Sequence, residues 1–182
     1  MIAEAKPPLA PRRKSTTMQT MTNKTIDFLR LSAFDRADIA AHMSDARMAE
    51  HMPLLKTPWD IAQAEAFVAA KEATWAENGL GHWGFARGGR YLGWGGFQRE
   101  GRGAEAEWDF GLVLRPEVFG LGPRIARQAL AYARGDPRIP FVTFLLPPTR
   151  RHLRPLGRLG ARRIGQVTHG GETFVKFRLE TA

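Results

Sequence analysis

The segment from residue 108 to residue 146 places the strongest constraint on the fold of this chain. Trp108–Leu114 has the composition of a strand, and Pro116 closes it because proline cannot continue a ladder. A helical pattern follows at Arg124–Arg134, and Phe141–Leu146 has the continuous apolar character of a buried strand. A strand, a helix and a second strand in this order predict a right-handed parallel crossover, and hence a mixed α/β fold.

Shorter patterns on both sides of this segment add antiparallel strands and further helices. Asp35 and Asp60 are predicted helix N-caps, and Asn78-Gly79 is the predicted end of the second helix. Glycine pairs at 88–89 and 170–171 predict two tight hairpins. The other predicted strands are 26–32, 82–86, 91–97, 161–168 and 173–179, and the other predicted helices are 36–46, 61–78 and an Arg-rich one at 149–159.

Composition limits the chemistry that the chain can carry. The 182 residues, a length typical of one domain, include no cysteine, which excludes disulfides, thiolate metal sites and cysteine nucleophiles. His42, His51, His82 and His169 are scattered without metal-ligand spacing, so no metal site is predicted. No apolar run approaches the roughly 18 to 20 residues of a membrane span. We therefore expect a soluble, cytoplasmic protein with no membrane partner.

The net charge of +9 comes from two short segments. Residues 1–24 carry five basic side chains and one acidic side chain in a polar, Pro-containing stretch, which predicts a disordered tail before a domain at 25–182. Met18 and Met21 are candidate starts, which would make part of the tail a start-site artefact. Residues 150–163 carry six arginines and no acid. Such segments fit a flexible arm and a site for phosphates or a polyanion, or else an ordinary solvated helix face.

Gly120-Leu121-Gly122-Pro123 connects the predicted strand and helix and is the sharpest candidate for a binding element. A helix that begins directly after such a loop presents unpaired backbone N–H groups, and its dipole favours a negative charge. Glycine lets a diphosphate approach the main chain. The loop lacks the third glycine of a dinucleotide fingerprint and the Gly-Lys-Ser/Thr of a P-loop, so neither is predicted. A tight turn that needs glycine for steric reasons is the other interpretation.

The run Asp109–Glu117, followed by Phe119–Gly122, contains an acidic residue and a glycine on a strand, then a proline, then an aromatic-Gly-x-Gly loop. This arrangement is similar to the strand and pyrophosphate loop of the GNAT N-acetyltransferase superfamily. Within it, the chain resembles the branch of ribosomal-protein N-terminal acetyltransferases, over residues 26–179. The other segments that carry the resemblance are Phe28–Leu31 with Asp35–Ile39 (first strand and helix), Asp45–Ala49 with Met52-Pro53 (substrate-side loop) and Leu156–Gly160 (last helix).

The resemblance implies a GNAT acyl-CoA N-acyltransferase fold, in which helices flank a mixed central sheet of about six to seven strands. It also implies direct transfer of acetyl from acetyl-CoA to a primary amine, without a covalent enzyme intermediate and without a metal. The implied contacts to acetyl-CoA are backbone groups beside the thioester and a segment around the phosphates, namely Leu112, Val113 and Leu114, then Phe119, Gly120, Leu121, Gly122 and Arg124.

A general base is needed because the amine must lose a proton. Asp109 is the first choice by motif position and Glu107 the second. They lie two apart on one face of a strand, so their like charges can raise one pKa, although both could instead line a solvent face. The pattern departs from the family at Glu117, where one alignment places Gln or Arg. The tyrosine that serves as the common general acid is also missing from the last helix.

The sequence thus predicts an acetyl-CoA-dependent N-acetyltransferase. Its acceptor would be a peptide or protein N-terminus, such as that of a ribosomal protein, or a small-molecule amine. The alternative is a GNAT-like module that no longer catalyses and that binds RNA or a protein through Arg150–Arg163. The enzyme interpretation does not call for nucleic acid, and it leaves a monomer and a homodimer equally open.

Overall fold

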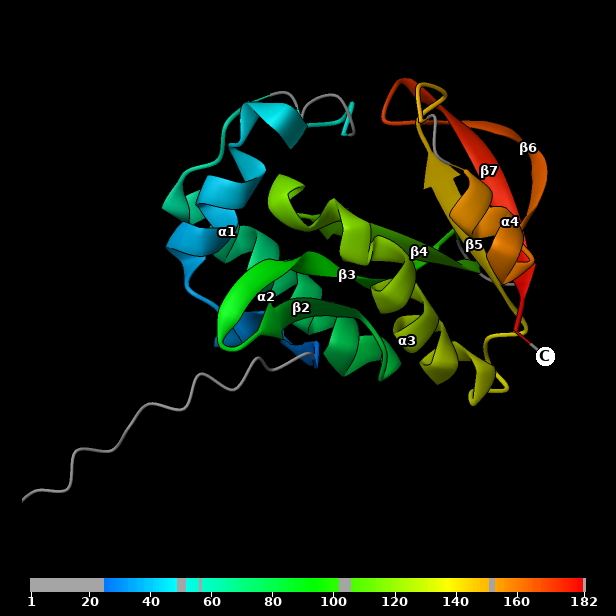
Figure 1. Cartoon of the computed structure of the whole chain (residues 1–182), viewed down its shortest axis with the longest axis horizontal. Coiled ribbons are helices and arrows are strands. Elements are labelled where there is room, and N and C mark those ends of the chain that lie inside the picture. The colour runs from blue at the N-terminus through cyan, green and yellow to red at the C-terminus, as the bar shows by residue number, and fades with distance from the viewer. Residues whose placement is uncertain (1–24, 49–51, 56, 102–105, 151–152, 182) are drawn as a thin grey trace, which may run out of the picture.

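The computed structural model describes residues 25–48, 52–55, 57–101, 106–150 and 153–181; the predicted tail at 1–24 lies outside this part. The described residues form one seven-stranded sheet in the order β1-β2-β3-β4-β5-β7-β6, with helices on both faces (Figure 1). This confirms the expected mixed α/β sheet. The elements are β1 (Asp27–Arg30), η1 (Leu31–Ala33), α1 (Arg36–Met43), η2 (Ala46–Met48), α2 (Ile61–Asn78), β2 (His82–Arg87), β3 (Arg90–Glu100), β4 (Glu107–Leu114), η4 (Pro116–Leu121), α3 (Gly122–Arg134), β5 (Phe141–Leu146), α4 (Arg154–Leu159), β6 (Arg162–His169) and β7 (Glu172–Glu180), where η marks a 3-10 helix.

The pairing of β4 with β5 is the feature of the sheet that matters most for a site. The two strands are parallel and are joined through η4 and α3, as the sequence predicts, whereas all other neighbours are antiparallel. Only Trp108↔Val142 and Asp109↔Thr143 pair, and beyond them the strands diverge (Figure 1). The rest of β4, to Leu114, pairs with β3 alone. The centre of the sheet is therefore split after Asp109.

Two hydrophobic clusters hold the layers together. On one face, Ile125 and Leu130 of α3 are buried against sheet residues that include Phe97. On the other face, α1 and α2 bury residues such as Ile39 against Trp94. Because α3 and α1 cover opposite faces and side chains alternate along a strand, successive residues of β4 face the two clusters in turn.

The helix signals in the sequence act as local physical chemistry predicts. Asp60 accepts a hydrogen bond from the Gln63 N–H at 2.7 Å, and the Gln63 side chain accepts one from the Asp60 N–H at 2.9 Å, which completes a capping box. Gly79 ends α2 in the left-handed conformation, with φ of 66°. Asp35 caps α1 by accepting from the Ala37 N–H at 2.8 Å. Both predicted N-caps are confirmed.

Some predicted boundaries are wrong. The first helix ends at Met43, with Ser44 as its C-cap, and not at Ala46, where a separate 3-10 turn, η2, begins. The Arg-rich helix begins at Arg154 and not at Thr149. Pro155 occupies its first turn, where a missing N–H costs no intrahelical hydrogen bond, so the proline marks the start of this helix.

The segment predicted as a glycine loop is helical: Gly120 and Leu121 end the 3-10 helix η4, and Gly122 and Pro123 begin α3. Neither Gly120 nor Gly122 has a positive φ, so the backbone there does not need glycine. A Cβ added at Gly120 would meet nothing within 4 Å, and one at Gly122 would make ordinary contacts with Leu112 at 3.7 Å and Leu114 at 3.8 Å. The interpretation that steric crowding within the fold requires these two glycines is therefore wrong.

Candidate active site

Two backbone N–H groups of β4 face the split in the sheet. The Arg115 N–H donates to the Leu92 carbonyl of β3 at 2.9 Å, and successive N–H groups along a strand point to opposite edges. By this alternation the N–H of Val113 also points to β3, whereas those of Leu112 and Leu114 point to the side of β5. The β4–β5 ladder ends at Asp109. Of the three predicted thioester contacts, Leu112 and Leu114 thus present their N–H groups to the opening.

Asp109 lies at the last residue pair before the split and is the most perturbed carboxylate of the site. Its side chain is buried, with 8% of the residue exposed. The Thr143 hydroxyl lies 3.3 Å from Asp109 Oδ1 and 3.4 Å from the Trp108 carbonyl, and its one hydrogen can donate to either. Burial, with a smaller contribution from the charge of Glu100, raises the pKa of Asp109 to about 7. Asp109 therefore does not line a solvent face and can exchange a proton near neutral pH.

Glu107, the second predicted base, lies on the same face but has a counter-ion. Its carboxylate forms an ion pair with Lys176 of β7. These two residues, with Glu100 and Gly101, line an open hollow of about 510 Å³ at the end of the β3–β4 hairpin. The structure therefore separates the two carboxylates: Asp109 is buried and has no cationic partner among the described residues, whereas Glu107 is paired at the rim of a hollow.

A hydrogen-bonded chain beside Asp109 was not foreseen from the sequence. The Lys71 Nζ of α2 donates to Gln98 Oε1 at 2.9 Å, and the Gln98 amide donates to Glu100. Gln98 lies directly opposite Asp109 in the β3–β4 ladder. Burial lowers the pKa of Lys71, while Glu100 and Asp109 act in the opposite direction. Only the sheet register brings these residues together, so no local sequence signal could have identified them.

The predicted phosphate segment lies on the outer side of the split. Gly120 is exposed, 40% of Phe119 is exposed, and Arg124 is exposed in the first turn of α3. Leu121 packs against the main cluster, so its contribution to a ligand would be its backbone. Gly122, the first residue of α3, donates its N–H to the Phe119 carbonyl of η4, and Pro123 has no N–H, so the expected free donors at these two positions are not present. The segment thus combines an open approach at Gly120 with one guanidinium, that of Arg124.

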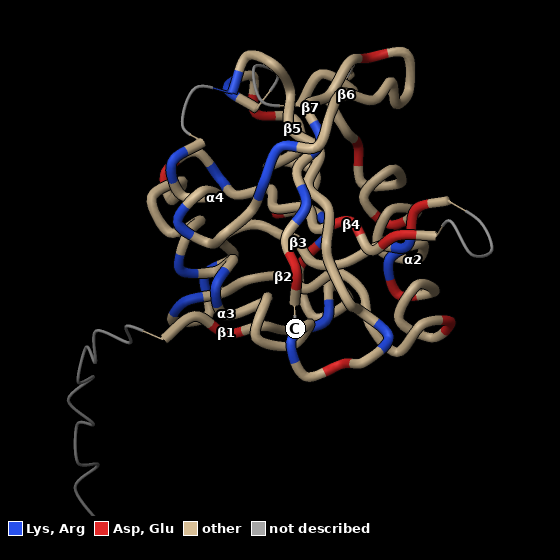
Figure 2. Tube along the Cα trace, turned by 90° about the vertical axis from the view of Figure 1, so that its right-hand side faces the viewer, with Lys and Arg blue, Asp and Glu red and all other residues tan. Residues whose placement is uncertain are grey.

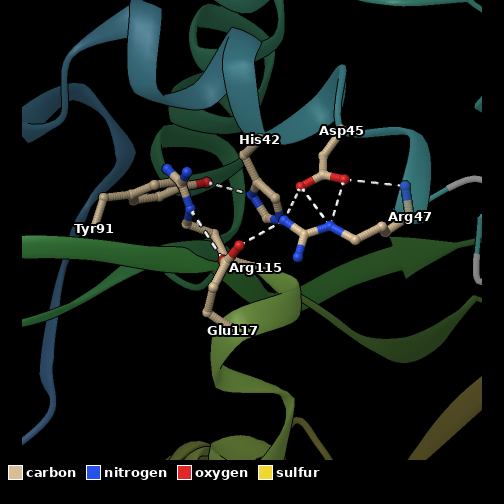
Figure 3. A network of polar contacts seen from close by, with 6 residues as sticks. All are labelled: His42, Asp45, Arg47, Tyr91, Arg115 and Glu117. Atoms are coloured by element: carbon tan, nitrogen blue, oxygen red, sulfur yellow. Dashed lines mark hydrogen bonds and ion pairs between the residues drawn. The ribbon is translucent and has the colours of Figure 1, made fainter.

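An ion-pair network connects this segment to the chain between α1 and α2 (Figure 3). Arg47 Nη2 lies 2.5 Å from Asp45 Oδ2 and 2.5 Å from Glu117 Oε1. The side-chain and backbone hydrogen bonds of Arg47 lower the pKa of Asp45 to about 2, and the Arg47 guanidinium also lowers the pKa of Glu117. Beneath the network, His42 Nδ1 lies 3.2 Å from the Tyr91 hydroxyl. Burial lowers the pKa of His42 to about 4, so this histidine is neutral at pH 7.

Charge is distributed unevenly around the site (Figure 2). Basic residues are frequent along α3 and α4, whereas several acidic residues lie on the side of β4 and α2. Within the predicted Arg-rich segment, Arg154 and Arg158 are exposed on α4, while Arg151 lies outside the described residues. The side of α3 and α4 is therefore the one suited to phosphates, and the side of Asp109 is suited to a cation.

In the described ranges, no group of three or more His, Asp or Glu side chains is placed to hold a metal ion. His82 is buried, and burial lowers its pKa to about 3. His51, which is also predicted not to bind a metal, lies outside those ranges. Each helix in the described part is too short or too polar to span a membrane.

Comparison with known proteins adds a family and a set of similar folds. The family model described as "Acetyltransferase (GNAT) domain" matches residues 28–162. The search of curated proteins gave no match. A GNAT-family acetyltransferase from Bordetella pertussis is 18% identical, with a TM-score of 0.67, and the alignment covers 84% of this chain and 94% of the other. An acetyltransferase from Agrobacterium tumefaciens str. C58 is 17% identical, with a TM-score of 0.66 and coverage of 94% and 99%.

A third similar structure was determined with ligands. It is the aminoglycoside acetyltransferase AAC(6')-Ib in complex with ribostamycin and coenzyme A, which is 15% identical to this chain. The TM-score is 0.67, and the alignment covers 86% of this chain and 92% of the other. At these identities the structural similarity is evidence for the fold.

Proposed function

The chain belongs to the GNAT acetyltransferase family and is an acetyl-CoA-dependent acyltransferase, and from this premise we propose that it acetylates a primary amine directly, with Asp109 as the general base. The observation that carries the proposal is the position of Asp109. Its carboxylate is buried at the point where β4 and β5 part, and its pKa is raised to about 7. A base with a pKa near the working pH combines a useful ionised fraction with a useful affinity for the proton.

The residues present fit acetyl-CoA. The N–H groups of Leu112 and Leu114 face the split and have no strand to pair with there, so they can bind a carbonyl group at the reacting end. Gly120 leaves open space beside η4, and Arg124 offers a guanidinium at the start of α3 for the phosphates. When bound, acetyl-CoA supplies the acetyl group as an activated thioester. The N–H groups of Leu112 and Leu114 would then hold its reacting end, and Arg124 would hold its phosphates.

The protein's own part in the reaction is proton transfer and orientation. Asp109 accepts one proton from the ammonium group, which frees the nitrogen lone pair to bond to the acyl carbon. As the carbon–sulfur bond breaks, the second proton that the nitrogen loses goes to the leaving thiolate. The Thr143 hydroxyl, 3.3 Å from Oδ1, orients the carboxylate. Gly111 follows on the same face of β4, and a Cβ there would meet nothing within 4 Å, which leaves room for the acceptor beside the base.

The acceptor is proposed to be cationic before it reacts. The face of Asp109 carries Glu100 and Glu107 as well, so three carboxylates there meet two lysines. Lys176 pairs with Glu107, and Lys71 is hydrogen-bonded to Gln98. A small-molecule amine is one candidate, since a similar structure holds ribostamycin. A peptide N-terminus, including that of a ribosomal protein, is the other. Both carry an ammonium group, so the charge of the site does not separate them.

The experiment that tests the function measures binding first and turnover second. Thermal melts of the full chain with and without coenzyme A should show stabilisation by the ligand. Gly120→Val should remove this stabilisation but keep the melting temperature of the free protein, because the added side chain meets open space. Gly135→Val, at the opposite end of α3, is the matched control, since a Cβ there makes only one contact, at 3.8 Å with the Tyr132 carbonyl.

A panel of amines then identifies the acceptor. Release of free thiol from acetyl-CoA would be followed with kanamycin, ribostamycin, polyamines and peptides with different N-terminal residues. Absence of coenzyme A binding by the wild-type chain would refute the proposed function. Equal stabilisation of wild type and Gly120→Val would instead reject only the assignment of the phosphate segment.

A further inference from the structure

Arg47 joins two segments of the chain that are distant in sequence. It lies in η2, after α1, and its guanidinium contacts Glu117 of η4, seventy residues later, at 2.5 Å. Asp45 holds the same guanidinium through contacts of 2.9 Å to Nε and 2.5 Å to Nη2 and also accepts the Arg47 backbone N–H at 3.0 Å. Figure 3 shows the guanidinium placed between the two carboxylates. Arg47 is thus fixed on one side and bridges to η4 on the other.

The contact matters because of where Glu117 lies. Glu117 and Gly120 belong to the same short 3-10 helix, whose other end opens α3. A diphosphate that binds beside Gly120 would be repelled by an unbalanced carboxylate on the same 3-10 helix, since like charges at short range repel even in water. Arg115 is farther from Glu117, at 3.8 Å. Arg47 is therefore the main group that balances the charge of Glu117.

We propose that Arg47 is a positioning residue for the phosphate segment: it holds the Glu117 carboxylate and cancels its charge where the diphosphate of acetyl-CoA enters. The inference rests on the proposed function. It adds a residue from the chain between α1 and α2 to a site otherwise built from β4, η4 and α3. Arg47 acts through Glu117 and makes no contact with the phosphates itself.

The chain contains a matched control for this role. Arg138 forms the same local structure with Asp136: its backbone N–H donates at 2.9 Å, Nε at 2.9 Å and Nη2 at 2.5 Å. The side chains of Arg47 and Arg138 are 59% and 60% exposed. Arg138 has no contact with η4 among its described interactions; its remaining hydrogen bond goes to the Asn78 carbonyl at 3.2 Å. Replacement of Arg138 therefore removes the same set of Arg–Asp hydrogen bonds but changes no contact with the phosphate segment.

The test measures coenzyme A affinity of the full chain by calorimetry at low ionic strength, where exposed charges are least screened. Arg47→Ala should weaken binding roughly three- to tenfold, the effect of one uncompensated charge a few ångströms from a phosphate in water. Arg138→Ala should stay within about twofold of wild type. The double variant Arg47→Ala, Glu117→Gln should recover most of the loss, because η4 then has no carboxylate to balance; Asp45, which remains, lies outside η4. Pantetheine, which has no phosphate, should bind all variants equally if it binds wild type measurably.

The outcomes separate the inference from the function on which it rests. No binding of coenzyme A by wild type would overturn both. Binding by wild type with equal losses in Arg47→Ala and Arg138→Ala would overturn the inference alone. A double variant as weak as Arg47→Ala would also overturn it, since Arg47 would then contact the phosphates directly. Circular dichroism of each variant confirms that the comparison is made between folded proteins.

Discussion

Replacement of Asp109 by Asn should make the protein more stable at pH 8 while it removes most of the activity. The pKa of Asp109 is raised from 3.8 to about 7, first by burial and then by the charge of Glu100. Between these two pH values the folded state binds more protons than the unfolded state, so stability falls as pH rises. Three pKa units correspond to about 4 kcal/mol at full ionisation, of which about 3 kcal/mol is lost between pH 4.5 and pH 8.

An asparagine side chain carries no charge, so the Asp109→Asn variant should lack this part of the pH dependence. The assay is urea unfolding of both proteins at pH 4.5 and pH 8, with acetyl transfer measured on the same samples. The free energy of unfolding should differ more between the two proteins at pH 8 than at pH 4.5, by roughly 1 to 3 kcal/mol in favour of the variant. In melts this is several degrees for a domain of this size.

Glu107→Gln provides the control for this comparison. Glu107 lies two residues away on the same face but is ion-paired with Lys176 and 30% exposed, so its replacement should give no such gain at pH 8. If wild type and Asp109→Asn lose stability in parallel between pH 4.5 and pH 8, the buried-charge argument is wrong. If Asp109→Asn keeps full turnover at neutral pH, the base is elsewhere.

Three further variants test single features of the structure. Glu100→Gln should move the midpoint of the profile of kcat/KM against pH below about 7, because the charge of Glu100 raises the pKa of Asp109. An unchanged midpoint would show that Glu100 does not influence the pKa of Asp109. Gly111→Val should raise KM for the amine without changing coenzyme A affinity, because the new side chain fills open space beside the base; steady-state kinetics and calorimetry measure the two effects. Asp60→Ala should lower the free energy of unfolding by about 1 kcal/mol through loss of the capping box with Gln63, with activity unchanged.

Local signals in the sequence predict most of the elements, because the interactions that set them are local. The capping box at Asp60 involves residues three apart, and the hairpin at Gly88-Gly89 needs only two positive φ angles, of 58° and 78°. Each feature forms within one turn of the chain. The parallel β4–β5 pair follows from the succession of strand, helix and strand, whereas the sequence does not predict the position of β7 between β5 and β6.

The site could be predicted only in part, because its geometry depends on contacts between distant segments. Asp109 has a strand position readable from the sequence, but its burial and the approach of Thr143 come from the β4–β5 pair. Lys71 reaches Gln98 across twenty-seven residues, and Arg47 reaches Glu117 across seventy. Nothing in the composition of these segments marks the partners. The same holds for the end of the β4–β5 ladder, which the twist and length of the strands decide.

The glycines of the described part give an independent reason to place the chemistry at the split. Gly93, Gly95 and Gly96 of β3 have no room for a side chain, because a Cβ there would come within 2.6 Å of a neighbouring carbonyl oxygen. At Gly111 and Gly120 the fold sets no such limit: neither has a positive φ, and a Cβ at either would meet nothing within 4 Å. The structure gives no reason for Gly157 of α4, the other described glycine with both properties.

Packing therefore explains the glycines of β3 but not those at 111 and 120, and a side chain at either of these two positions would project into space that a ligand can use. Gly111 lies beside the buried carboxylate of Asp109, on the face that suits an amine. Gly120 lies beside the first turn of α3, on the side that carries the arginines. The two openings are at the two places where direct transfer needs two substrates to approach, one to the base and one to the phosphate segment. A purely structural origin for both glycines would require a constraint that neither their backbone conformation nor their surroundings contain.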